Sequence, residues 1–198
     1  AGFLVFFMQA GFALLGAGAI RAKSTVNYLV KSYMDFSAGA IAFVLIGFAL
    51  MFGGSGLAPG LERGNPFIGY SGWLLTGEAY DVSTNMLFLF QMMFAATAAT
   101  IASGAMAERT RYGAYLIGAV LISGVIYPIF GSWVWGGVYG GQGWLAKLGF
   151  IDFAGSTVVH SIGAWCALAG ILVLGPRLGR FAPDGSARLI PGHNLGLV

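Results

Sequence analysis

Residues 153–174 constrain this chain most, because they run for the thickness of a membrane without one formal charge. The hydrocarbon core of a bilayer is ~30 Å thick, and a helix that rises ~1.5 Å per residue needs about 20 apolar residues to cross it. The run therefore predicts a transmembrane helix. Because an ionisable group is costly inside such a helix, His160 within it is a candidate functional residue.

The imidazole of His160 suits a site that shares or exchanges a proton near neutral pH, because each ring nitrogen can donate or accept a hydrogen bond. The alternative is a neutral histidine that only packs against a neighbouring helix, and position alone leaves both open. Asp152 directly precedes the run and is expected to cap its helix or to draw cations toward it. His160 follows Asp152 by eight positions, which correspond to ~12 Å along a helix and exclude a direct bond between the two.

The composition extends the prediction of membrane helices to the whole chain. Of the 198 residues, 58% are hydrophobic and 9% are charged, whereas soluble domains carry about 25% charged residues. The sequence therefore predicts an all-α polytopic membrane protein. Apolar runs place its transmembrane helices at about residues 2–20, 28–52, 85–107, 112–133 and 153–174, and the final LGLV is the expected start of a sixth.

Basic side chains gather where the first, third and fifth runs end. Because cytoplasmic segments carry an excess of Lys and Arg, this asymmetry predicts a multi-pass protein of the cell membrane with its amino end outside. Five crossings are unusual for a whole transporter and natural for one half of an inverted repeat. The inner basic residues are Arg21, Lys23, Lys31, Arg109, Arg111, Arg177, Arg180 and Arg188, and Arg63 and Lys147 lie outside.

Lys31 and Asp35, at i and i+4 on one helix face, are a candidate ion pair.

Aromatic residues mark two further candidate sites. Phe90 and Phe94 are one helical turn apart, so their rings could gate a narrow path or simply belong to the core. At the glycine-rich loop VWGGVYGGQGW, Trp133 directly before the loop or Trp135 within it could hold a small cation against its ring or could anchor the chain at the membrane interface. The same loop also contains Tyr139 and Trp144.

Several classes of function are excluded by what the sequence lacks. It has one cysteine, Cys166, and two histidines, so we expect no metal site and no cofactor. No phosphate-binding glycine loop and no nucleophile paired with a base occur, so the chain is not expected to be an enzyme. No nucleic-acid partner is expected, because topology accounts for the basic residues.

Three strings together resemble the ammonium transporter family, called Amt in prokaryotes and plants, Mep in fungi, and related more distantly to the Rh proteins. They are FMQAGFALLGAGAIRAK, FQMMFAATAATIASGAMAER and DFAGSTVVHSIGA. The resemblance covers residues 1–198 and corresponds to the first five-helix half of the family's inverted-repeat fold. It implies transport of ammonium or ammonia across the bilayer by a homotrimer with one pore per subunit.

The resemblance also implies roles for individual residues. Asp152 is similar to the aspartate at the outer mouth that stabilises the ammonium site, and His160 to the first of two pore histidines. Phe94, with Phe90 beside it, resembles the phenylalanine gate. Trp135 is similar to the tryptophan that holds ammonium before entry, so Trp135, Asp152 and Phe94 are expected to recruit the ion.

The sequence departs from the family pattern in places, which keeps a second function open. Gly16 stands where many relatives have glutamate, Ser132 where a histidine is common, and Ser156 where the family has a second glycine. The alternative is an Amt-like ammonium sensor with a fused cytoplasmic signalling domain. For a transporter, a regulator of the PII type is a possible inner partner. The second pore histidine belongs to the family's second half.

Overall fold

The computed structural model describes residues 1–137, 141, 143–190 and 192–198, and these residues form an all-helical bundle, as predicted. Five helical stretches are long and apolar enough to cross a membrane. Short π-helical turns interrupt or begin three of them. The stretches are α1 (Gly2–Ala19), α2 (Thr25–Ala42) continuing through Phe43–Gly47 into α3 (Phe48–Phe52), α4 (Val82–Met106), α5 (Tyr112–Leu121) continuing through Ile122–Ile126 into α6 (Tyr127–Val134), and Ser156–Ser161 leading into α8 (Ile162–Leu174).

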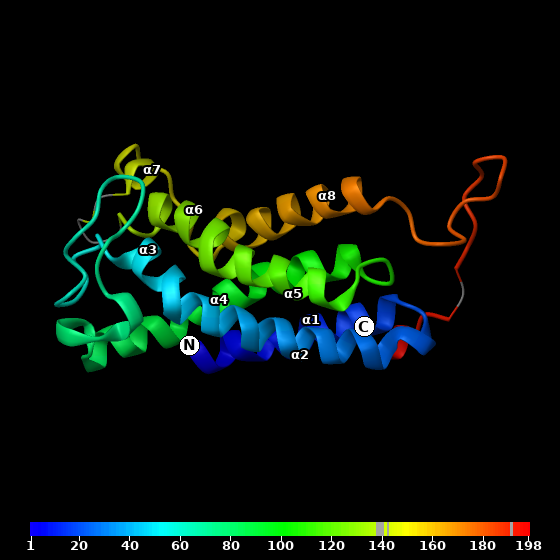
Figure 1. The fold of residues 1–198 in the computed structure, drawn as a ribbon, viewed down its shortest axis with the longest axis horizontal. Coiled ribbons are helices and arrows are strands. Elements are labelled where there is room, and N and C mark those ends of the chain that lie inside the picture. The colour runs from blue at the N-terminus through cyan, green and yellow to red at the C-terminus, as the bar shows by residue number, and fades with distance from the viewer. Residues whose placement is uncertain (138–140, 142, 191) are drawn as a thin grey trace.

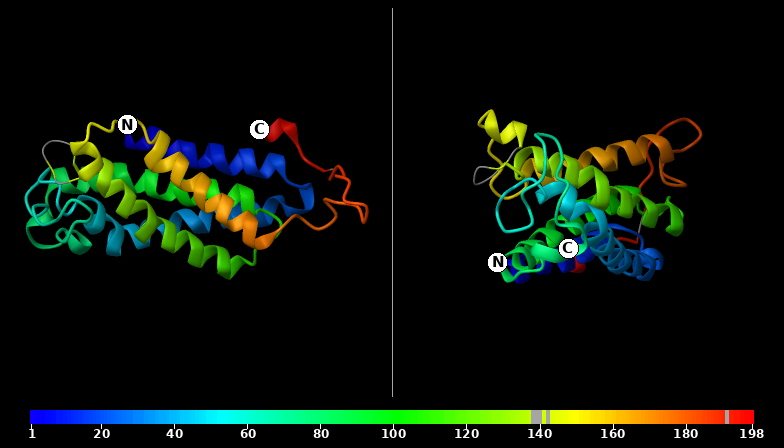
Figure 2. Two further views of the ribbon diagram at one scale, coloured as in Figure 1. Left: turned by 90° about the horizontal axis from the view of Figure 1, so that it is seen from above. Right: turned by 60° about the vertical axis from the view of Figure 1, so that its left-hand side comes forward.

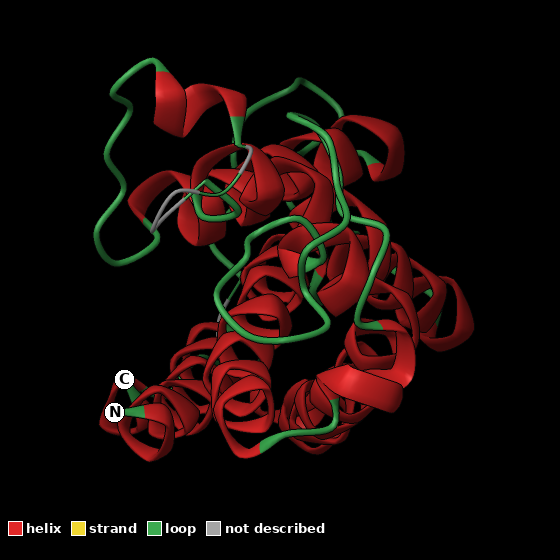
Figure 3. Ribbon diagram, turned by 90° about the vertical axis from the view of Figure 1, so that its left-hand side faces the viewer, coloured by secondary structure: helices red, strands yellow, loops and turns green. Residues whose placement is uncertain are grey.

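The helices lie side by side along the long axis of the molecule (Figure 1). Residues 53–81 and residues 143–155, which include the short helix α7 (Trp144–Lys147), gather at one end, named here the loop end. The turns after α1 and α4 and residues 175–190 lie at the opposite end, named here the basic end (Figure 2). Figure 3 looks along the bundle from the loop end.

Helix α4 lies at the centre of the bundle and packs against α1, α2 and α8. Lipid tails are as apolar as leucine, so helices in a membrane associate through close packing of small side chains. The buried part of α4 follows this rule. It contains Ala95, Ala96, Thr97, Ala98, Ala99, Thr100, Ala102 and Ser103.

The π-helical turns Phe43–Gly47 and Ile122–Ile126 pack against each other. Their close approach depends on glycine, because a Cβ atom on Gly47 would lie 2.8 Å from the carbonyl oxygen of Ser123 and 2.9 Å from the ring of Pro128. Pro128 follows the second π turn, where the backbone ladder is already interrupted and its missing N–H group is tolerated.

Asp35 is fully buried and joins four helices through hydrogen bonds. Its carboxylate accepts from the Thr100 hydroxyl of α4 at 3.0 Å, from Gln9 Nε2 of α1 at 3.3 Å and from the Tyr115 hydroxyl of α5. The described residues contain no direct ion pair between Lys31 and Asp35, contrary to the sequence-based expectation. The Lys31 ammonium instead lies 4.2 Å from the centroid of the Tyr115 ring, and both carboxylate oxygens of Asp35 accept hydrogen bonds from other helices.

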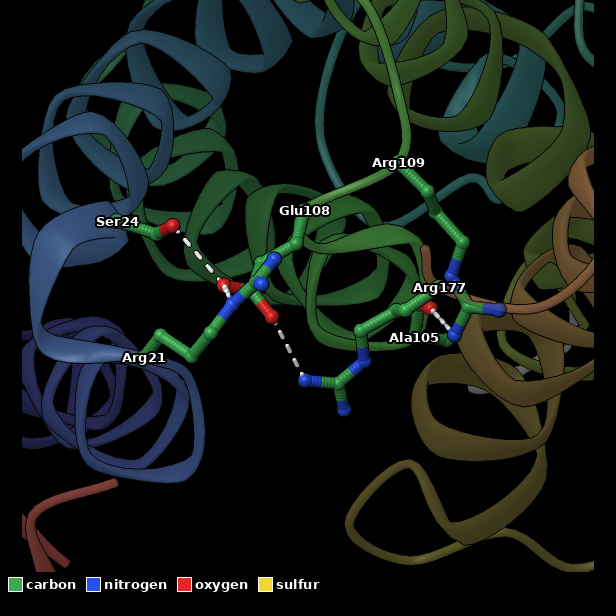
Figure 4. Close-up of polar contacts among 6 residues, drawn as sticks. All are labelled: Arg21, Ser24, Ala105, Glu108, Arg109 and Arg177. Atoms are coloured by element: carbon green, nitrogen blue, oxygen red, sulfur yellow. Dashed lines mark hydrogen bonds and ion pairs between the residues drawn. The ribbon is translucent and has the colours of Figure 1, made fainter. Parts of the chain in front are cut away.

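Glu108 ties the basic ends of three helices together (Figure 4). Its carboxylate accepts hydrogen bonds from Arg21 Nε at 2.7 Å, Ser24 Oγ at 2.9 Å and Arg177 Nη1 at 2.9 Å. Glu108 has a left-handed φ of +63°, which costs a residue with a Cβ atom about 1 kcal/mol, and the three donors offset that cost. Burial alone would raise the pKa of Glu108, but the two guanidinium groups and the hydroxyl outweigh it and hold the pKa below its usual value.

Replacing Lys31 by methionine would remove the cation over the Tyr115 ring and its attraction, without direct contact, to the buried carboxylate of Asp35. We expect Lys31→Met to lower the free energy of unfolding in detergent by about 1–2 kcal/mol, measured by tryptophan fluorescence. Adding Asp35→Asn should restore most of that loss, because neither charge then remains. Val30→Ala, at an exposed position, is the control. A double variant no more stable than Lys31→Met would contradict the coupling.

The depressed pKa of Glu108 makes its contribution to stability depend on pH. The contribution is fully present above the pKa that glutamate has in the unfolded chain, and it disappears as pH falls through the lower folded value. At neutral pH we expect Glu108→Gln to cost about 2 kcal/mol, measured by thermal unfolding. The difference from the wild type should shrink in acid, and a difference that is independent of pH would contradict this account.

Candidate functional site

Asp152 organises the start of the last membrane helix. Its carboxylate accepts hydrogen bonds from the backbone N–H groups of Gly155 and Ser156 at 2.7 and 3.0 Å, and from those of Thr157 and Val158 at 2.8 and 2.7 Å. These are the free donors of a first helical turn, so the carboxylate caps the helix as expected. The residue that directly precedes the helix is nevertheless Gly155, with a φ of +91° that glycine tolerates.

The same hydrogen bonds set the charge of Asp152. Its side chain is buried, which alone would raise the pKa of the carboxyl group, but the four backbone donors outweigh burial and lower the pKa below its usual value. The carboxylate is therefore ionised at neutral pH. Because its oxygens are already committed to backbone donors, it acts on a ligand mainly as a nearby negative charge.

Three aromatic rings continue from Asp152 toward α4. The indole Nε1 of Trp135 donates to the Asp152 carbonyl oxygen at 2.7 Å. The Trp135 ring lies 5.8 Å from the ring of Phe94 at an interplanar angle of 64°, and Phe94 lies 5.1 Å from Phe90 at 89°. These edge-to-face contacts are favourable arrangements for aromatic pairs and hold the rings in place.

One cavity of about 410 Å³ at the loop end is bordered by all four of these residues. Its wall also includes the side chain of Gln91, which the sequence reasoning missed. A polar side chain inside an apolar run is itself a signal, and Gln91 lies between the two phenylalanines. The cavity is lined by Phe52, Leu57, Leu87, Phe90, Gln91, Phe94, Trp135, Ile151, Asp152 and Phe153.

The other tryptophans of the loop belong to a separate cluster. The Trp133 ring lies 5.7 Å from Trp144, which lies 6.4 Å from Phe67. Trp133 Nε1 donates to the Phe67 carbonyl oxygen at 3.0 Å, so this cluster anchors the long loop to α6. Tyr139 lies outside the described residues.

His160 does not line the cavity at the loop end and is exposed beside α1. Its Nδ1 atom lies 3.1 Å from the Gly155 carbonyl oxygen, and its ring is 6.3 Å from Phe12. A carbonyl oxygen only accepts hydrogen bonds, so this contact requires a proton on Nδ1. In the neutral ring Nε2 then keeps its lone pair as an acceptor. Phe12 is a second neighbour that sequence spacing alone did not indicate.

The described part of the chain contains no group of three or more His, Cys, Asp or Glu side chains that could hold a metal ion. The loop-end site is therefore built from a fixed negative charge, aromatic faces and one amide. Such a set can attract a small cation and contact it through π faces, a contact worth about 0.5–2 kcal/mol depending on desolvation.

Comparison with known proteins finds relatives along the whole chain. The chain is 50% identical over 209 aligned residues to the ammonium transporter Amt2 of Archaeoglobus fulgidus, covering 100% of this chain and 42% of that protein. It is 47% identical to a putative ammonium transporter of Synechocystis, covering 97% of this chain and 35% of that protein. The chain thus spans less than half the length of these relatives.

Solved structures share the fold. A structure titled Sensor Amt Protein superposes with a TM-score of 0.88 at 40% identity, covering 99% of this chain and 47% of that one. Mep2 of Candida albicans gives a TM-score of 0.79 at 30% identity, covering 99% and 42%. The model of the Ammonium Transporter Family matches residues 1–198. The chain therefore belongs to the ammonium transporter family, of which it represents the first half.

Proposed function

We propose that this chain belongs to a protein that moves ammonium or ammonia across the cell membrane. The observation that carries the proposal is the cavity at the loop end, where an ionised Asp152 and the ring of Trp135 meet the paired rings of Phe90 and Phe94. Its relatives named as ammonium transporters support the same substrate. In this proposal the loop end faces outward, as the distribution of basic residues favours.

Recruitment depends on partial compensation of the ion's lost hydration. A bare cation in an apolar pore faces a large desolvation cost. At the loop end, the charge of Asp152 and the π face of Trp135 offset part of that cost while water still reaches the cavity. Phe94 adds a second ring and, together with Phe90, closes the path beneath the cavity. Only a small species passes when these two rings move apart.

Beyond the gate, ammonia and its proton move separately. Neutral ammonia crosses an apolar path at far lower cost than the ion. Ammonia contacts His160 on this path, because the Nε2 lone pair of His160 can accept a hydrogen bond from ammonia or take up a proton. The second half of the protein supplies the facing wall. Assembly as a homotrimer and regulation from the basic end by a PII-type protein belong to the same proposal.

A sensor is the second candidate function, and one observation favours it. The structure titled Sensor Amt Protein is more similar in sequence and in fold than Mep2, with 40% against 30% identity and TM-scores of 0.88 against 0.79. In a sensor, the same loop-end cavity binds ammonium, and the helices pass the change to a signalling domain instead of conducting. The two functions differ in whether ammonium produces a sustained electrical current across the membrane.

The role of His160 can be tested electrically. In liposomes that contain the full-length protein, a jump in external ammonium should give a saturating current, and His160→Ala should reduce it about 100-fold or abolish its selectivity. His193→Ala, at an exposed position in the segment after α8, is the control and should conduct normally. An unchanged current in His160→Ala would contradict the role. Ammonium binding by the wild type without sustained current would favour the sensor.

The negative charge of Asp152 should set the affinity for the cation. We expect Asp152→Asn to weaken the apparent affinity for ammonium at least about tenfold, because a unit charge near the cation is removed. Asp81→Asn is a matched control, since Asp81 caps α4 at the same end and does not line the cavity. Both variants lose helix-capping strength, so only a loss of affinity confined to Asp152→Asn supports the proposal.

A further inference from the structure

Gln91 lines the loop-end cavity, and its amide oxygen is buried directly behind the cavity wall. Its side chain is 8% exposed, and its amide oxygen is buried without a hydrogen-bond donor. An unsatisfied buried acceptor costs about 1–3 kcal/mol, so native structures keep few of them. The amide lies on α4 between the two phenylalanines, one turn from Phe94, and borders the cavity with Trp135 and Asp152.

The strong acceptors of Asp152 are already occupied. Its carboxylate oxygens receive four backbone N–H groups, and its carbonyl oxygen receives the indole N–H of Trp135. Apart from Gln91, the rest of the wall consists of aromatic and aliphatic side chains. An ammonium ion has four N–H donors, and rings satisfy them only weakly. Among the side-chain oxygens of this wall, the amide oxygen of Gln91 is the one that receives no hydrogen bond.

We propose that the amide oxygen of Gln91 accepts a hydrogen bond directly from the N–H group of the cation held at the loop end. This assignment rests on the proposed function and adds a residue that contacts the substrate. Because the oxygen is buried behind the cavity wall, the assignment requires a half-turn of the terminal amide, which exchanges its oxygen and nitrogen and brings the oxygen to the cavity. The acceptor then gains its partner when the ligand arrives.

If the proposal holds, removing the amide of Gln91 changes stability and ammonium affinity in opposite directions. Leucine is comparable in size to glutamine and has no polar atom, so Gln91→Leu should raise the unfolding temperature of the ammonium-free protein. The same variant should weaken ammonium binding about tenfold, measured by isothermal titration with ammonium chloride against sodium chloride. A purely structural glutamine predicts the reverse for stability, because its loss would remove a useful contact.

Two further variants make the test decisive. Gln91→Glu keeps an acceptor of the same length, and it should bind ammonium at least as tightly as the wild type. Met93→Leu, a buried change on α4 away from the cavity, should leave affinity unchanged. Wild-type affinity in Gln91→Leu, or lost affinity in Gln91→Glu, would overturn the assignment. A wild type that neither binds nor conducts ammonium would instead overturn the proposed function.

Discussion

The cost of placing a polar group in hydrocarbon governs this structure more than any single contact. Inside a bilayer, no water is present to satisfy a charge, so each charged side chain must find its partner within the bundle. Asp35 does so through hydrogen bonds from three other helices, and Lys31 does so against the Tyr115 ring. These contacts fix α1, α2, α4 and α5 relative to one another, and the position of the candidate site depends on that frame.

The two ends of the bundle use carboxylates in different ways. At the loop end, Asp152 is held by backbone N–H groups, so its negative charge remains available to attract a cation. At the basic end, Glu108 is held by two guanidinium groups that neutralise it, and it serves to join helix ends. Both carboxyl groups have lowered pKa values, yet only Asp152 leaves an uncompensated charge beside a cavity. This asymmetry is what the proposed recruitment of a cation at the loop end requires.

Much of the candidate site was predictable because it follows local rules. The spacing of Phe90 and Phe94 places both rings on one helical face, and they are in contact. A carboxylate just before a long apolar run is a cap, and Asp152 caps the helix. Gln91 was overlooked although its signal was local as well, since it is a polar residue within an apolar helix. Its unsatisfied oxygen became apparent only when all neighbouring donors were known.

The sequence by itself determined the all-helical membrane class and the number of crossings, because the length of an apolar run is measured directly against the thickness of a bilayer. Only the tertiary structure decided which partners meet across the bundle. It brought Trp135 and not Trp133 to Asp152, and it gave Lys31 the Tyr115 ring in place of Asp35. These choices depend on contacts between segments far apart in the chain, and local spacing carries no information about such contacts.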